Sequence, residues 1–310
     1  MSAPHALLNG LVDFAGLFPP AGLDMRSAVL AYAGYRQGPH AHVLGSFVVP
    51  AARLDECGAE LAALGDGDTT GRVWLLSVLA GELDIPRALH FAPAADRGPS
   101  AQVGSIEVKA DTAAGVARAT ALVPRAMTMA VEVPLTIGRE DRRSVLTAVR
   151  SAGRLAKLRT GGLTPESIPM PAQVAEFIWD CARAGVPFKA TAGLHHPVRA
   201  EHPLTYAPDS PRAVMHGFIN VFLASAVAWA AAQSDEAVRS PDPPADVIDL
   251  LDERDPSAFR LEHDAVRWRG TVITAMELAR VRARFARSFG SCSFSEPVSD
   301  LETLGWLPRP

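Results

Sequence analysis

The feature that most constrains this fold is a regular alternation of short strand-like runs with helical patterns along 310 residues. Eight runs have the length and composition of strands, namely 10–18, 42–50, 72–80, 104–110, 127–135, 154–159, 186–192 and 289–294. Helical patterns lie between most of them, at 24–37, 51–64, 111–123, 140–152, 171–184 and 212–232. Eight such units predict a closed (β/α)8 barrel, the TIM barrel. A doubly wound open sheet is the alternative.

The connection between the seventh and eighth runs is much longer than the others. Residues 194–288 contain a helix, a polar, proline-rich loop at 234–245, and an amphipathic helix at 274–288. Between these, alternating apolar and polar residues at 259–263 and 265–269 predict a small hairpin. We therefore interpret residues 1–310 as a single barrel domain with an elaborated last connection.

Composition excludes several classes of function. The net charge is −4 and the isoelectric point about 6.1, so no basic field indicates nucleic-acid binding. Three widely spaced cysteines argue against a disulfide framework, and the N-terminus lacks a signal-peptide pattern, so we expect a cytoplasmic protein. The uncharged stretch 213–232 is long enough for a membrane span, but its polar residues favour a buried helix on the barrel wall.

Two strand-like runs end in a lysine followed by a small, glycine-containing turn. They read LAKLRTGG at 155–162 and PFKATAG at 187–193, and they place Lys157 and Lys189 32 positions apart, about one βαβ unit. On neighbouring parallel strands the two ammonium groups would crowd each other. Such crowding is one of the few ways to obtain a neutral, nucleophilic lysine near pH 7.

Charged residues alternate with apolar ones in several of these runs. Neighbouring side chains of a strand point to opposite faces, and the apolar face of a barrel strand meets the helices, so the charged residues must point inward. This reasoning places six charged residues around one interior: Glu107, Lys109, Glu132, Lys157, Arg159 and Lys189. A structural ion-pair network and a polar site at the C-terminal mouth both fit this pattern. The excess of cations favours an anionic substrate, a carboxylate or a phosphate.

Small residues follow the last three strand-like runs, where barrels often bind phosphate. Backbone amides at such turns form an anion cradle. Together with nearby polar side chains they give a set of candidate substrate-binding residues: Arg159, Lys109, Thr160, Gly161, Gly162, Thr191, Gly193, His195, His196, Gly290, Ser291 and Ser293.

These motifs resemble those of the deoxyribose-phosphate aldolase family of class I aldolases. In that family strand six carries a Lys-Thr-Ser-Thr-Gly motif with the Schiff-base lysine, and strand seven carries Lys-Pro-Ala-Gly-Gly with a second lysine that lowers the pKa of the first. Lys157 and Lys189 fall at these positions. The run GSCS at 290–293 is similar to the family's Gly-x-Ser-Ser. Asp13 is similar to an aspartate of strand one, and Glu107 stands at the position of the relay aspartate in strand four.

The sequence therefore predicts an aldolase-like or lyase enzyme that acts on a small anionic carbonyl compound without a cofactor. Lys157 would form a Schiff base, and Lys189 would keep it partly neutral. Glu107 or Glu132 would move protons, and Asp13 completes the predicted catalytic set.

Alternatives stay open. A metal-dependent barrel lyase or hydrolase would use His195 or His196 with the carboxylates. A non-catalytic barrel would bind an anionic metabolite. Cys292 could be a nucleophile, but no base partner is evident, and cysteines in strands usually pack as small core residues. The arginine-rich helix at 274–288 is compatible with a homodimer.

Overall fold

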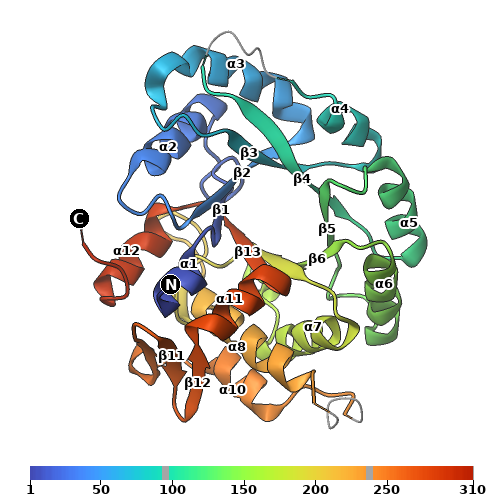
Figure 1. Ribbon diagram of the computed structural model, residues 1–310, viewed down its shortest axis with the longest axis vertical. Coiled ribbons are helices and arrows are strands. Elements are labelled where there is room, and N and C mark those ends of the chain that lie inside the picture. The colour runs from blue at the N-terminus through green and yellow to red at the C-terminus, as the bar shows by residue number, and fades with distance from the viewer. Residues whose placement is uncertain (93–97, 235–239, 310) are drawn as a thin grey trace.

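Eight parallel strands close into a barrel, which confirms the predicted TIM-barrel fold (Figure 1). The computed structural model describes residues 1–92, 98–234 and 240–309. The barrel strands are β1 (Val12–Phe14), β2 (Leu44–Pro50), β3 (Trp74–Leu79), β4 (Ala101–Lys109), β5 (Thr128–Glu132), β6 (Leu155–Arg159), β7 (Phe188–Thr191) and β13 (Ala286–Ser291). Because β1 pairs with both β2 and β13, the ring is closed, and the open doubly wound sheet is wrong.

Helices surround the ring, as Figure 1 shows for α2 to α7. The helices between barrel strands are α2 (Met25–Gln37), α3 (Leu54–Leu64), α4 (Ile85–Leu89), α5 (Ala113–Leu122), α6 (Arg139–Ser151), α7 (Pro171–Ala184), α8 (Phe218–Ala231), α10 (Ala245–Asp252) and α11 (Ala275–Arg284). Two further helices, α1 (Ala3–Leu8) and α12 (Ser295–Thr303), precede β1 and follow β13.

Local signals in the sequence set several helix boundaries. The Asp24 carboxylate caps α2, where it accepts a hydrogen bond from the Ser27 backbone N–H at 2.8 Å. Helix α7 begins with Pro171 and is capped after Ala184 by Gly185, whose φ of +63° lies in the left-handed region that glycine adopts without strain. Such caps satisfy backbone groups that a helix end leaves unpaired.

The connection between β7 and β13 carries two small sheets. One consists of the antiparallel strands β8 (Ala200–Pro203) and β9 (Arg212–Met215). The other consists of β10 (Phe259–Leu261), β11 (Ala265–Trp268) and β12 (Thr271–Thr274). The predicted hairpin is therefore present, with β12 as an additional strand.

Two predicted helices have different bounds in the structure. The pattern over 212–232 predicts one helix, but its first residues form β9 and the helix α8 begins at Phe218. Gly217 lies between the two elements. A Cβ at this position would collide with the backbone of the segment that contains Pro197 and Arg199, so the chain requires glycine here. The helix predicted over 274–288 ends at Arg284, because the residues from Ala286 onward enter the barrel as β13.

Parts of two predicted irregular segments lie outside the described residues. These are residues 93–97, in the third connection, and 235–239, in the proline-rich loop. Across the described ranges, no helix combines the length and apolar character that a bilayer span requires. The stretch expected to be a buried helix is largely α8, whose first nine residues are buried.

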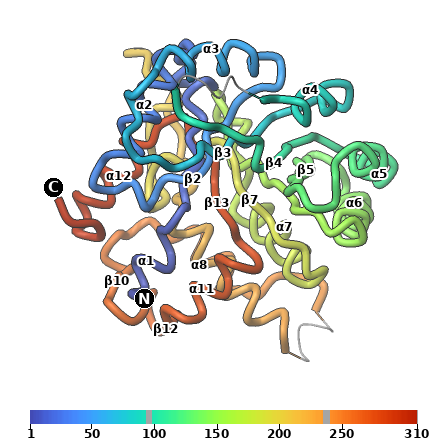
Figure 2. The backbone as a smooth tube through the Cα atoms, turned by 45° about the horizontal axis from the view of Figure 1, so that its top comes forward, coloured from blue at the N-terminus to red at the C-terminus, as the bar shows by residue number. Residues whose placement is uncertain are grey.

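The long connection contributes to both ends of the barrel. Figure 2 shows the N-terminus grouped with β10, β12 and α11 below the barrel. There α1 packs against α11 and β11, and the Ala3 backbone N–H donates to the His263 carbonyl at 2.7 Å. At the opposite end, Leu204 and Met215 from the β8–β9 ribbon border a cavity above the C-terminal ends of the strands.

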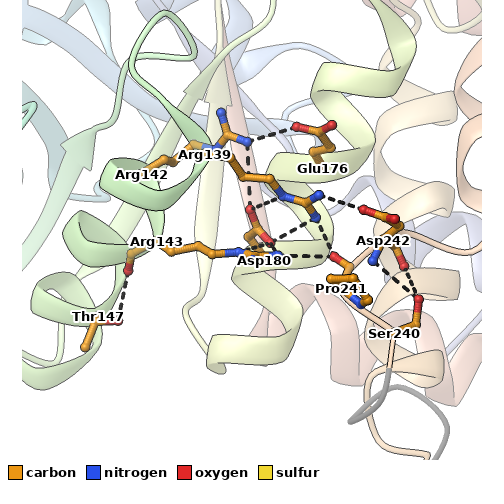
Figure 3. A network of polar contacts seen from close by, with 9 residues as sticks. All are labelled: Arg139, Arg142, Arg143, Thr147, Glu176, Asp180, Ser240, Pro241 and Asp242. Carbon is orange, nitrogen blue, oxygen red and sulfur yellow. Dashed lines mark hydrogen bonds and ion pairs between the residues drawn. The ribbon is translucent and has the colours of Figure 1, made fainter.

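A buried carboxylate ties α6, α7 and the segment before α10 together (Figure 3). The Asp180 side chain, only 1% exposed, accepts hydrogen bonds from Arg143 at 3.0 Å and from Arg139 at 3.3 Å. Arg139 also binds the Asp242 carboxylate at 2.8 Å, and both arginines donate to the Pro241 carbonyl. Asp180 is thus the counter-ion that holds the last connection against the barrel helices.

Replacement of Asp180 by alanine should lower the free energy of unfolding by about 3 kcal/mol, because the arginines lose a buried partner. Urea denaturation of the purified variant measures this. Asp242→Ala is the matched control, since Asp242 binds the same Arg139 but is 73% exposed, and its loss should cost at most about 1 kcal/mol. Equal losses in the two variants would contradict the assignment of Asp180 as the anchoring charge.

Candidate active site

The barrel interior carries an alternating chain of carboxylates and lysines. The Lys157 Nζ lies 2.8 Å from the Glu107 Oε2 and 2.9 Å from the Glu132 Oε2. The Lys189 Nζ lies 2.6 Å from the Asp13 Oδ2 and 2.7 Å from the Glu107 Oε1. Glu107 therefore bridges the lysines, and each lysine is held between two carboxylates. The structure brings all five predicted catalytic residues into one network.

The register of the strands explains this cluster. Lys157 on β6 pairs in register with Glu132 on β5 and with Lys189 on β7. The residues beside each lysine in its strand are fully buried apolar side chains, for example Leu158 and Phe188. Because they face the helix layer, the alternation of the strand turns both lysines into the ring.

Hydrogen bonds from neighbouring strands orient two of the carboxylates. The Ser77 hydroxyl on β3 donates to Glu107 at 2.5 Å. The Ser288 hydroxyl on β13 donates to Asp13 at 2.7 Å, and the Ser46 backbone N–H donates to the same carboxylate at 2.8 Å. Sequence reasoning missed these serines. The signal for Ser77 was its position as a polar residue in the otherwise apolar strand β3.

Opposite charges dominate the electrostatics of the network. Burial alone would raise the pKa of Glu107, but the charges of Lys189 and Lys157 hold it well below its usual range. Burial alone would lower the pKa of Lys189, but Asp13 and Glu107 outweigh this effect and raise it. The prediction that the two ammonium groups crowd each other did not take into account that Glu107 contacts both of them. Glu107 lies between the two ammonium groups and compensates their like charges.

A cavity of about 280 Å³ opens over this network at the C-terminal ends of the strands. Lys157, Lys189 and Glu107 line it, together with apolar side chains such as Leu79 and Met215. Ligand pockets commonly measure about 300–1,000 Å³, so this cavity suits a small metabolite.

Six of the predicted substrate-binding residues line the cavity: Arg159, Gly162, Thr191, Gly193, His195 and Gly290. The Arg159 side chain is 54% exposed, and its Nε lies 3.4 Å from the Glu132 Oε1. Gly193 has a φ of +75°, and a Cβ on it would lie 3.0 Å from the Gly161 Cα. The turns after β6 and β7 therefore touch through their glycines, and this close approach requires the absence of side chains.

Lys109 and Thr160 do not border this cavity. Lys109 is exposed and borders a separate surface depression with Glu82 and Arg118. The prediction that it points into the shared interior is wrong, because it is the last residue of β4 and lies beyond the enclosed part of the ring. Thr160 is buried, and its hydroxyl donates to the Ala192 carbonyl at 2.5 Å, which ties the two turns together.

Three further predicted residues, His196, Ser291 and Ser293, are not among the residues that line the cavity. The His196 Nδ1 lies 2.7 Å from the Asp300 Oδ2, and its ring stacks on His202 at a centroid distance of 3.4 Å. Ser291 is buried. The Ser293 hydroxyl accepts a hydrogen bond from the Glu296 backbone N–H at 3.2 Å, in the first turn of the helix.

Both histidines that the metal-dependent alternative considers pair with carboxylates of α12. The His195 Nδ1 lies 2.8 Å from the Glu296 Oε2, while His196 pairs with Asp300. In the part of the chain that the structure describes, no three histidine, cysteine, aspartate or glutamate side chains are grouped so that they could hold a metal ion.

Comparison with known proteins gives a distant structural match only. No protein-family model and no curated protein matches this chain. The solved structure of phospho-2-dehydro-3-deoxyheptonate aldolase (DAHP synthase) from Thermotoga maritima matches with 10% identity and a TM-score of 0.37, over 59% of this chain and 50% of that one. A truncated form of 3-deoxy-D-arabino-heptulosonate 7-phosphate synthase from the same organism matches with 12% identity and a TM-score of 0.34, over 59% and 62% of the two chains. Similarity of this degree concerns the fold alone.

The lowered pKa of Glu107 predicts a specific loss of stability in acid. The unfolded chain has a glutamate pKa of about 4.3, so the ionised Glu107 stabilises the fold above that pH. This stabilisation is lost as the pH falls through the lower pKa of the folded state. Between pH 5 and pH 3, the free energy of unfolding should therefore fall more steeply for the native protein than for Glu107→Gln.

Urea denaturation at each pH measures both slopes, and the exposed Glu140→Gln variant sets the baseline for a surface glutamate. Parallel slopes for the native protein and Glu107→Gln would contradict the pairing of Glu107 with the lysines.

Proposed function

We propose that the cavity is the active site of an aldolase-like or lyase enzyme, which acts on a small anionic carbonyl compound through a Schiff base on Lys157. The observation that carries this proposal is the environment of Lys157. Its amine lines a small pocket inside the barrel and lies within 2.9 Å of two carboxylates, those of Glu107 and Glu132.

The composition of the chain supports a chemical role for the interior lysines. Only three of its 30 lysine and arginine residues are lysines, namely Lys109, Lys157 and Lys189, and the last two lie in the barrel interior. A structural ion-pair network needs only cations, which arginine supplies elsewhere in this protein. Arginine does not lose its proton in proteins, whereas the amine of lysine can, and lysine forms imines with carbonyl compounds.

The neighbouring carboxylates suit the formation of an imine. For Lys157 to attack a carbonyl carbon, its Nζ must be unprotonated, and Glu107 and Glu132 lie at distances of direct proton transfer. The attack gives a carbinolamine, whose oxygen takes up protons and leaves as water. The resulting iminium carries a positive charge at the same nitrogen, so the same carboxylates stabilise it. The iminium then accepts the electron pair of the adjacent carbon–carbon or carbon–hydrogen bond.

Lys189 and Asp13 act on the formation of the imine indirectly, through Glu107. The raised pKa of Lys189 keeps its ammonium charged, and that charge helps to keep Glu107 ionised. A continuous path of hydrogen bonds and ion pairs runs from Asp13 through Lys189 and Glu107 to Lys157. These contacts hold the carboxylate of Glu107 in place beside the amine of Lys157.

The rim of the cavity suits an anionic group. Arg159 is half exposed and holds Glu132 only at 3.4 Å, so its guanidinium can turn to a carboxylate or phosphate and bind it through two hydrogen bonds. Gly162 and Gly193 line the cavity without side chains, which leaves their backbone accessible to a ligand.

Reduction with borohydride in the presence of small aldehydes and 2-oxo acids should attach a substrate fragment to Lys157. Peptide mapping by mass spectrometry identifies the modified amine, because the sequence offers only three lysines besides the N-terminus. Lys157→Arg should abolish this adduct, since the guanidinium keeps the positive charge but does not form the imine.

Lys109→Arg is the matched control, because Lys109 is the exposed lysine of the chain and its replacement should leave the adduct unchanged. If Lys157 stays unmodified in a panel that traps an established Schiff-base aldolase, the proposed reaction is wrong, and the network is structural.

A further inference from the structure

A second group of reactive side chains borders the same cavity. Cys292, directly after β13, and His195, after β7, both line it. The Cys292 Sγ lies 3.8 Å from the His195 Nε2, and the His195 Nδ1 lies 2.8 Å from the Glu296 Oε2. A thiol, an imidazole and a carboxylate thus follow one another in the order of a nucleophile, its base and the group that orients the base.

Tyr206 closes this arrangement from the β8–β9 ribbon. Its hydroxyl donates to the Glu296 Oε2 at 3.1 Å and lies 3.8 Å from the Cys292 Sγ. The four side chains therefore come from four different segments that meet beside the cavity. Cys292 and Glu296 are each contacted twice within the group, which fixes the thiol against the ring of His195.

The charges around His195 favour this chemistry. Burial alone would lower the pKa of His195, but its hydrogen bonds to Cys292 and Glu296 raise it to about 9. A protonated imidazole beside a thiol is the arrangement that activates cysteine nucleophiles. Among the residues that the structure describes, the other two thiols have no such partner: burial raises the pKa of Cys57 to about 12 and that of Cys181 well above its usual value.

We propose that Cys292, His195 and Glu296 form a nucleophilic thiol site in the cavity and that its ligand is an aldehyde. The sulfur of Cys292 attacks the carbonyl carbon as the thiolate, and the electron pair of the carbonyl π bond moves to oxygen. That oxygen takes the proton of the His195 imidazolium. The product is a hemithioacetal, formed reversibly without oxidation or reduction. The choice of an aldehyde rests on the proposed function, whereas the reactivity of the thiol does not.

The rate of alkylation by iodoacetamide at pH 6.5 tests the reactivity of the thiol. An ordinary cysteine with a pKa of about 8.5 is only about 1% thiolate at this pH. Cys292 should therefore react at least about tenfold faster in the native protein than in His195→Gln, as measured by mass spectrometry of the cysteine peptides. Glu296→Gln, which keeps the shape of the orienting side chain, should also slow the reaction.

Cys57 and Cys181 serve as internal probes of folding, because both are fully buried and should stay unmodified in every variant that folds. Equal rates for Cys292 in the native protein and in His195→Gln, with Cys57 and Cys181 protected, would overturn the thiol site.

Protection by propanal tests the class of ligand. Propanal should slow the alkylation of Cys292 in the native protein and in Lys157→Arg alike, whereas propanol should not. Protection that disappears in Lys157→Arg would show that the aldehyde reacts at the lysine and would overturn the hemithioacetal. Because alkylation does not require Lys157, failure of the borohydride experiment and failure of the thiol site can be told apart.

Discussion

The charged network in the interior of this barrel depends on the two ion pairs of the Glu107 carboxylate. This carboxylate is buried and binds Lys157 through one oxygen and Lys189 through the other. An ionised carboxylate is stable in such a place only when its charges are paired and its remaining lone pairs are hydrogen-bonded. The closed ring satisfies this requirement, because it directs side chains from β3, β4, β6 and β7 toward one axis. An open sheet would separate them.

The fold and the charged network were largely predictable because both rest on period-two alternation. A charged residue between two apolar ones, as at Lys157 and Lys189, can face only the interior when helices cover the outside. Alternation shows to which face of the sheet a side chain points. It does not show whether the residue lies within the enclosed part of the barrel or beyond it. Lys109 therefore shares the parity of Glu107 and yet lies outside the enclosed ring. The hydroxyl of Ser288 was missed because sequence does not show which carboxylate it meets.

Contacts between the loops and helices at the mouth of the barrel were beyond the reach of the sequence, because strand alternation does not specify them. Cys292 and His195 are separated by 97 positions, and neither lies in a motif that points to the other. Their approach requires closure of the barrel between β7 and β13 and the placement of α12 beside the cavity. The same limit applies to the β8–β9 ribbon, whose second strand is separated from α8 by only His216 and Gly217. There the steric demand at Gly217, and not the hydropathy pattern, sets the boundary.

The amine of Lys157 and the thiol of Cys292 require opposite charges nearby. They can share one cavity because different charged groups surround each of them. In the proposed reactions, Lys157 would form a cationic product and lies among carboxylates, whereas the reactive form of Cys292 would be an anion and lies beside the imidazole of His195. Exchange of the two environments would suppress both reactions, since carboxylates disfavour a thiolate and an imidazolium disfavours an iminium. The electrostatics therefore suit the proposed amine chemistry in the barrel interior and the proposed thiol chemistry at the wall formed by α12 and the β8–β9 ribbon.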